Sequence, residues 1–260
     1  MRTFEQAEGA WIFVSHSNRD FKAVREIRNT LEGFGHYPIL FFLKCISDDS
    51  EIDDLIRREI KARDWFVLCD SENSRASKWV QQEQEIIKSY EDKRYEEINL
   101  GMDLGPQLEK LKKLSDDTTV FISYRRAIAD IAHRIYDRLK LGGFRAWLDS
   151  LNIPIGSDFV EEITGQIETA LDGGWVLLLI DRDYFKPNPA PNDWCMFEAS
   201  YALRASGTRP KNRLIPIIVD DPGLALQHAP PQLKQILYVD LFTDFNSGIE
   251  KLIRRMKTNS

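Results

Sequence analysis

The stretch WIFVSHS at Trp11–Ser17 returns in altered form as TVFISYR at Thr119–Arg125, and this repeat decides the fold. Each run is an apolar, strand-like pattern that ends in serine and further polar residues. An amphipathic helical stripe, a glycine turn and a second short apolar run follow, in LEGFGHYPILFF (Leu31–Phe42) and LKLGGFRAWLD (Leu139–Asp149). The chain therefore contains two copies of one structural unit.

Each copy continues with a second helix, a third apolar run and a further helix. The third runs are WFVLC (Trp65–Cys69) and WVLLLI (Trp175–Ile180). Near-continuous apolar strands that alternate with amphipathic helices predict a parallel sheet covered on both faces. We therefore expect an α/β protein of two doubly wound, flavodoxin-like units in tandem, over residues 1–117 and 118–260.

The two copies differ in how complete their strand pattern is. The second adds LIPIIV (Leu214–Val219) and ILYVDL (Ile236–Leu241), which makes five expected strands, and closes with a helix around Ile249–Met256. The first has only YEEINL (Tyr95–Leu100), a poor strand pattern, and a charged helix over Pro106–Leu114. We expect the first unit to be truncated, with its fourth strand in question and no fifth strand.

Composition and charge exclude several classes of protein. The 260 residues are 43% hydrophobic and 29% charged, with a net charge of −6 and no basic tract, so nucleic acid and anionic membranes are not expected partners. The sequence has no run that could span a bilayer and no signal-peptide order at its start, which predicts a cytoplasmic protein. Three scattered cysteines (Cys45, Cys69 and Cys195) fit reduced thiols, and no metal site is expected.

Standard catalytic signatures are mostly missing from the sequence. It contains no P-loop, GxGxxG, HExxH, GxSxG or CxxC motif, and its four histidines lack metal-ligand spacing. In open α/β sheets, ligands bind beyond the carboxyl ends of the strands. The polar residues at those ends are Ser15 and His16 in one copy and Ser123, Tyr124, Arg125 and Arg126 in the other. We expect a site at this edge of each sheet.

A tryptophan followed four residues later by a glutamate marks the helix after the third strand in both copies. The pairs are Trp79 with Glu83 and Trp194 with Glu198. These helices are expected to begin at the same edge of the sheet, so that one carboxylate in each unit faces the crevice. The alternative interpretation is that the tryptophans pack in the core and the glutamates are solvated.

Each copy resembles a Toll/interleukin-1 receptor (TIR) domain, and the second copy is the closer match. FISYRR (Phe121–Arg126), WLDSLNIPIGSDF (Trp147–Phe159) and NDWCMFE (Asn192–Glu198) resemble the family's first motif, its second strand with BB loop, and its WCxxE segment. In the first copy, FVSHSNRD (Phe13–Asp20) resembles TIR-like bacterial defence proteins, but LKCISDDSEIDD (Leu43–Asp54) has no Pro-Gly element. With these motifs, the chain resembles bacterial antiphage TIR enzymes of the Thoeris type.

The resemblance implies an enzyme that cleaves the nicotinamide–ribose bond of NAD+, which is its substrate and not a bound cofactor. Glu198 would be the catalytic carboxylate, with Glu83 as its counterpart. Nicotinamide is a cationic leaving group that needs no general acid, so one carboxylate that stabilises the oxocarbenium-like charge can suffice. The product, ADP-ribose or a cyclic derivative, would be a signal in bacterial antiviral defence that a downstream effector reads, and TIR–TIR self-association would accompany it.

The resemblance also implies residues that contact the substrate. Tyr124 or Trp194 would stack on a flat ring, and Arg125 or Arg126 would pair with the pyrophosphate. The full expected set is Ser123, Tyr124, Arg125, Arg126, Asp149, Ile155, Gly156 and Trp194 in the second copy, with Ser15, His16 and Trp79 in the first.

Two other functions remain open at this point. A non-catalytic TIR signalling adaptor or scaffold, acting by TIR–TIR association, predicts binding without turnover. A hydrolase similar to nucleoside deoxyribosyltransferases, a related sandwich that uses a glutamate on N-glycosidic bonds, predicts activity on free nucleosides. The sequence does not choose between hydrolysis and cyclisation of NAD+.

Overall fold

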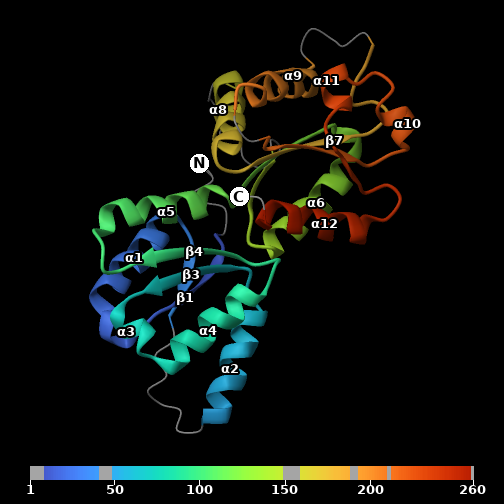
Figure 1. Ribbon diagram of the computed structural model, residues 1–260. Helices are drawn as coiled ribbons and strands as arrows, with labels where there is room; N and C mark the ends of the chain where they lie inside the picture. The colour runs from blue at the N-terminus through green and yellow to red at the C-terminus, as the bar shows by residue number, and fades with distance from the viewer. Residues whose placement is uncertain (1–8, 41–48, 149–158, 188–192, 210–211, 259–260) are drawn as a thin grey trace. The chain divides into compact units, whose positions relative to one another are not determined.

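A computed structural model describes residues 9–40, 49–148, 159–187, 193–209 and 212–258, without the side chains of residues 49–52 and 159. The chain divides into two compact units, a first domain over Glu8–Ser115 and a second domain over Asp116–Met256. Each contains one parallel sheet with helices on both faces (Figure 1). The predicted α/β fold class, two flavodoxin-like units in tandem, is confirmed.

The first domain has four parallel strands in the order β2-β1-β3-β4. The strands are β1 (Trp11–Ser15), β2 (Tyr37–Ile39), β3 (Trp65–Asp70) and β4 (Arg94–Asn99). Its helical elements are η2 (Asn18–Asp20), α1 (Phe21–Gly33), α2 (Asp49–Lys61), α3 (Glu72–Arg75), α4 (Lys78–Ser89) and α5 (Leu104–Asp116).

The fourth strand of the first domain is fully formed, although its sequence pattern is poor. β4 pairs with β3 in parallel from Trp65 opposite Arg94 to Asp70 opposite Asn99. Only Ile98 in β4 is buried, which fits an edge strand whose backbone pairing is satisfied on one side. The described part of this domain contains no fifth strand, so the sheet ends at β4.

The second domain has five parallel strands in the order β6-β5-β7-β8-β9. They are β5 (Thr119–Tyr124), β6 (Arg145–Leu148), β7 (Trp175–Ile180), β8 (Leu214–Ile218) and β9 (Val239–Asp240). Its helical elements are η3 (Arg126–Ile128), α6 (Ala129–Leu141), α8 (Phe159–Asp172), α9 (Trp194–Ser206), α10 (Pro222–Ala225), α11 (Pro231–Lys234) and α12 (Phe245–Thr258). In Figure 1, α8 and α9 cover one face of this sheet and α6 and α12 the other.

The fifth strand of this sheet is much shorter than the apolar run ILYVDL predicts. Only Val239 and Asp240 form β9. The Asp240 carboxylate accepts hydrogen bonds from the backbone N–H groups of Phe242 and Thr243, which turns the chain immediately after the strand. Leu237, in the middle of the run, is 93% exposed. The apolar pattern alone therefore predicts a longer strand than the structure has.

The core of the second domain surrounds its central strands. Every residue of β5 and β7 is buried, because both faces of each strand are covered. Phe121 on β5 stacks on Trp147 of β6, with the ring centroids 4.9 Å apart. None of the described helices is both long and apolar enough to cross a membrane.

Gly174 is expected to be intolerant of a side chain. A Cβ atom there would lie 2.0 Å from Thr119 Oγ1 and 2.2 Å from the Thr119 carbonyl oxygen, whereas a Cβ at Gly165 on α8 would meet no atom within 4 Å. Gly174→Ala should therefore destabilise the chain by about 1–3 kcal/mol through overpacking. Gly165→Ala should stabilise it by about 0.5–1 kcal/mol. Thermal unfolding of both variants tests the difference, and equal midpoints would contradict it.

Candidate functional site

A buried glutamate contacts the end of the central strand in each domain. Glu83 on α4 and Glu198 on α9 are each 5% exposed. Ser15 Oγ donates a hydrogen bond to Glu83 Oε2 over 2.7 Å, and Ser123 Oγ donates to Glu198 Oε2. The two predicted carboxylates therefore lie in equivalent places, at the carboxyl edge of their sheets, and neither is a solvated surface group.

A tyrosine that the sequence analysis missed joins the contact in the second domain. The Tyr184 hydroxyl lies 2.6 Å from Ser123 Oγ. Since the single proton of Ser123 is directed to Glu198, Tyr184 is the donor to Ser123. Burial raises the pKa of Tyr184 well above its ordinary value, so the hydroxyl keeps its proton. Its position just after the third strand, at the same sheet edge, is the signal that could have found it.

Arg125 is held by the protein around the start of α9. Its Nη2 atom donates to the Tyr184 carbonyl oxygen over 2.6 Å and to Asp193 Oδ2 over 2.9 Å. Asp193 caps α9, because its other carboxylate oxygen accepts from the Met196 N–H over 3.2 Å. Burial of Asp193 acts to raise its pKa, but the hydrogen bond from Arg125 contributes to a net lowering. These bonds fix the first turn of the helix that carries Glu198. They also occupy the Arg125 guanidinium, which was expected to pair with a pyrophosphate.

The remaining expected contacts in the second domain differ in accessibility. Tyr124 is buried, and its carbonyl oxygen accepts a hydrogen bond from Cys195 Sγ over 3.3 Å. Trp194 is 38% exposed and touches Phe197 edge to face, so part of its ring faces solvent. Arg126 is exposed at the start of η3. Asp149, Ile155 and Gly156 lie outside the described residues, as does Cys45.

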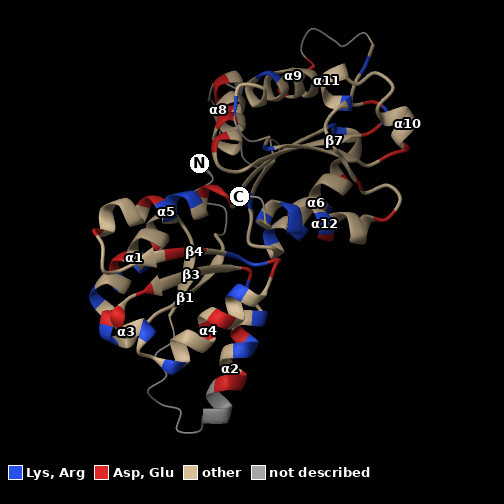
Figure 2. Ribbon diagram, in the orientation of Figure 1, with Lys and Arg blue, Asp and Glu red and all other residues tan. Residues whose placement is uncertain are grey.

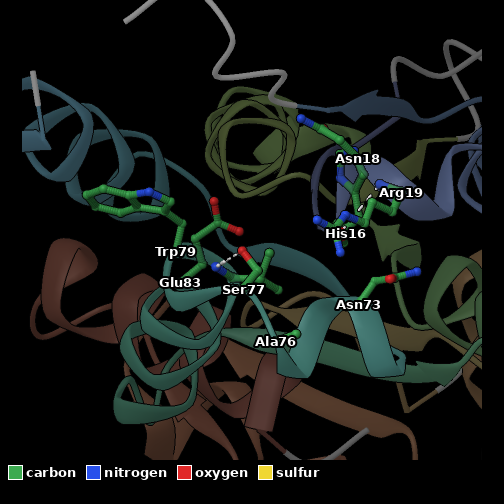
Figure 3. A pocket seen from close by; sticks show the side chains of 10 residues that line it. His16, Asn18, Arg19, Asn73, Ala76, Ser77, Trp79 and Glu83 are labelled. Atoms are coloured by element: carbon green, nitrogen blue, oxygen red, sulfur yellow. Dashed lines mark hydrogen bonds between the residues drawn. The ribbon is translucent and has the colours of Figure 1, made fainter. Parts of the chain in front are cut away.

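A cavity of about 320 Å³ lies beside Glu83 in the first domain. Figure 3 shows the Glu83 carboxylate between the Trp79 ring on one side and the segment with His16 and Asn18 on the other. Ser15, which donates a hydrogen bond to Glu83, does not line the cavity. The volume is at the lower end of the range for small-molecule sites. The cavity thus combines one carboxylate with a ring and several polar side chains.

Two loops of this cavity are tied together by an aspartate. Asp20 accepts hydrogen bonds from Ser71 Oγ and from Asn73 Nδ2, each over 2.6 Å. These bonds connect the turn after β1 with the turn after β3. Asn73 lines the cavity and was missed by the sequence analysis, although its place after the third strand indicates the carboxyl edge.

The first-domain carboxyl titrates near neutral pH. Burial raises the pKa of Glu83 from its ordinary value of 4.5 to about 7, and the hydrogen bond from Ser15 opposes this shift. Burial also lowers the pKa of His16 on the opposite wall, which favours a neutral imidazole. Within the described ranges, no group of three or more His, Cys, Asp and Glu side chains could hold a metal ion.

Glu83 is expected to make the stability of the first domain depend on pH. Its folded pKa of about 7 exceeds its ordinary value of 4.5, so the folded state holds the extra proton between these values and stability falls as pH rises through them. The shift corresponds to about 3 kcal/mol. Glu83→Gln cannot ionise and still offers an acceptor to Ser15. It should therefore gain about 2.5 kcal/mol over the wild type at pH 8 relative to pH 5 in urea unfolding.

Glu85→Gln is the matched control for this prediction. Glu85 lies two positions along α4 and is exposed. Its substitution should change the free energy of unfolding equally at both pH values. A Glu83→Gln variant with no pH-dependent gain would show that the folded protein does not hold Glu83 in its protonated form.

Comparisons with known proteins agree with the duplicated architecture. The model of the TIR domain family matches residues 12–106 and 120–253. No curated protein matches the chain. A solved structure described as the activated Roq1 resistosome directly recognizing the pathogen effector XopQ (TIR domains) is 16% identical, with 54% of this chain and 96% of that chain covered and a TM-score of 0.37. On the family match over both repeats, the chain belongs to the TIR domain family.

Proposed function

We propose that this protein cleaves the bond between nicotinamide and ribose in NAD+, with Glu198 of the second domain as the essential carboxylate. The observation that carries the proposal is the contact of Ser123 with a buried Glu198 at the carboxyl edge of a parallel sheet. Ligands of open α/β sheets bind at this edge. The sequence resemblance of the second copy to NAD+-cleaving TIR domains supports the choice of substrate.

One positioned carboxylate is enough for this reaction. The electrons of the breaking C–N bond pass to the cationic nicotinamide ring, which leaves neutral, and positive charge develops on the ribose carbon. A fixed carboxylate stabilises that charge, and such preorganised electrostatic contributions commonly dominate catalysis. Water at the ribose carbon then gives ADP-ribose and a proton. Attack by a group of the same molecule gives a cyclic product.

Glu198 suits this role better than Glu83 because more contacts position it. The serine that holds Glu198 is itself held by Tyr184, and Arg125 with Asp193 fixes the start of its helix. Ser15 is the only described residue that donates a hydrogen bond to Glu83.

The proposal includes the setting that the sequence resemblance implies. A second TIR domain would complete the pocket through TIR–TIR association. The ADP-ribose-derived product would act as a signal for a downstream effector in the cytoplasm during antiphage defence. The residues expected to contact NAD+, with Trp194 as the most exposed aromatic among them, belong to this proposal.

Substitution of Glu198 tests the proposal directly. Glu198→Gln keeps the size of the side chain and an acceptor for Ser123 but removes the charge, so nicotinamide release from NAD+ should fall by about 10²–10³-fold. Chromatography of nicotinamide released by concentrated protein measures this, and mass spectrometry identifies the ribosyl product. Glu250→Gln, an exposed position on α12, is the control and should keep full activity.

The parallel variant Glu83→Gln separates the two domains. It should retain most of the activity if Glu198 is the essential group. Unchanged release by Glu198→Gln protein would overturn the assignment, and loss confined to Glu83→Gln would move the site to the first domain.

A non-catalytic adaptor is the second candidate function. The observation in its favour is the burial of Glu198, which is 5% exposed and already engaged by a hydroxyl. This function predicts association of the chain through its TIR surfaces with no nicotinamide release at any concentration. A hydrolase of free nucleosides predicts release of base from nucleosides and none from NAD+.

A further inference from the structure

A second cavity, of about 710 Å³, lies at the opposite edge of the second-domain sheet. Trp175 and Leu214, the first residues of β7 and β8, line it, whereas Ser123 and Glu198 lie at the carboxyl ends of the strands. Helix α12 forms another wall. This cavity is therefore separate from the site that the proposed function uses, and its volume is in the range of sites for drug-sized molecules.

The mouth of the cavity carries exposed apolar side chains. Leu237 is 93% exposed and Tyr238 is 45% exposed, and both line the cavity together with the more buried Ile215 and Ile236. Large apolar side chains at the mouth of a hollow indicate a surface that an apolar group covers. The short β9 explains this exposure, because the residues that precede it are not drawn into the sheet.

The wall formed by α12 is cationic. Lys251 and Arg255 line the cavity four residues apart, which places them on one face of the helix. Figure 2 shows the basic residues gathered on α12. Lys251 is exposed, and its ammonium charge also acts on Asp240, which lines the same cavity. A Cβ at Gly248 would lie 2.5 Å from the Asp240 carbonyl oxygen, so the absence of a side chain lets α12 approach β9 closely.

The lining also contains an acidic side chain. Asp240 is the one carboxylate among the described lining residues. It accepts a hydrogen bond from the Thr243 hydroxyl over 2.7 Å and others from backbone N–H groups of the following turn. The hydrogen bond from Thr243 is the main cause of its lowered pKa. The carboxylate thus accepts the hydrogen bonds of the turn and also interacts electrostatically with Lys251. Lys251 and Arg255 provide two cations against this one carboxylate, one helical turn apart along the cavity.

A buried donor completes the lining. Trp175 is buried, and its indole Nε1 has no hydrogen-bond partner among the described residues. One face of the ring is covered by the Arg213 guanidinium, 4.7 Å from the ring centroid, and Arg213 is paired with Asp117. A buried N–H group without an acceptor is destabilising, and here it belongs to a residue of the cavity lining.

We propose that this cavity binds a small amphipathic anion, which has a flat or branched apolar body and a phosphate or carboxylate head. The apolar body lies against the Leu237–Tyr238 mouth and the Ile215 wall, and the head pairs with Lys251 and Arg255. The site is independent of the proposed NAD+ cleavage, because none of its lining residues belongs to the network around Glu198.

Calorimetric titration of the full chain tests this site with three probes of one shape. These are 1-naphthyl phosphate, 1-naphthoate and the neutral 1-naphthol. The two anions should bind with one site per chain, and 1-naphthol at least tenfold more weakly. Comparison of the two anions shows whether a phosphate or a carboxylate head is preferred. No heat from either anion at millimolar concentration would overturn the proposal.

Charge-reversal variants locate the binding. The double variant Lys251→Glu, Arg255→Glu should weaken anion binding at least tenfold. Leu237→Asp should also weaken it, because it replaces an apolar side chain at the mouth of the cavity with a negative charge. Arg254→Glu is the matched control, because Arg254 is exposed on the same helix but does not line the cavity. Thermal unfolding should show that all these variants, altered at exposed positions, remain folded. Equal weakening by Arg254→Glu, or none by the double variant, would contradict the assignment.

Discussion

The hydrogen bond from a strand-terminal serine to a buried glutamate connects the main parts of each domain. Ser15 and Ser123 end the apolar part of the central strands, and Glu83 and Glu198 come from the helix after the third strand. A carboxylate buried without a donor would be strongly destabilising, so this contact makes the position of the helix depend on the strand. It also holds the acidic group at the sheet edge where ligands bind.

The residues around this serine–glutamate hydrogen bond differ between the two domains. In the second domain, Tyr184 holds Ser123, and the Arg125–Asp193 pair fixes the first turn of α9. In the first domain, Glu83 faces a cavity, and burial brings its pKa to about 7. One carboxyl therefore accepts a hydrogen bond from a serine that a tyrosine supports, and the other changes charge at neutral pH. The duplication provides an internal comparison for any function assigned to either copy.

The sequence predicts the fold well where the signal is local. Buried strands such as β5 and β7 are near-continuous apolar runs, and the repeat places the two serines and two glutamates at equivalent positions. The prediction is poorer at the sheet edges: β4 forms despite its charged residues because pairing with β3 stabilises it, and β9 is shorter than its apolar run because Asp240 turns the chain. Edge strands depend on tertiary pairing and on turns, which apolar periodicity does not report.

The side-chain network of the site was harder to predict than the carboxylates themselves. Tyr184, Asp193 and Asn73 act through contacts between segments far apart in the chain, which apolar periodicity does not report. Arg125 was expected to face a substrate, and its bonds to Tyr184 and Asp193 are visible only in three dimensions.

Removal of the two serines one at a time tests the central claim most directly. Ser123→Ala leaves Glu198 without its serine donor, and Ser15→Ala does the same to Glu83. The measurement is the rate of nicotinamide release from NAD+ by each variant at equal concentration, with thermal unfolding as a check on folding. The account predicts a large loss with Ser123→Ala and little change with Ser15→Ala. Equal rates for both variants and the wild type would contradict it.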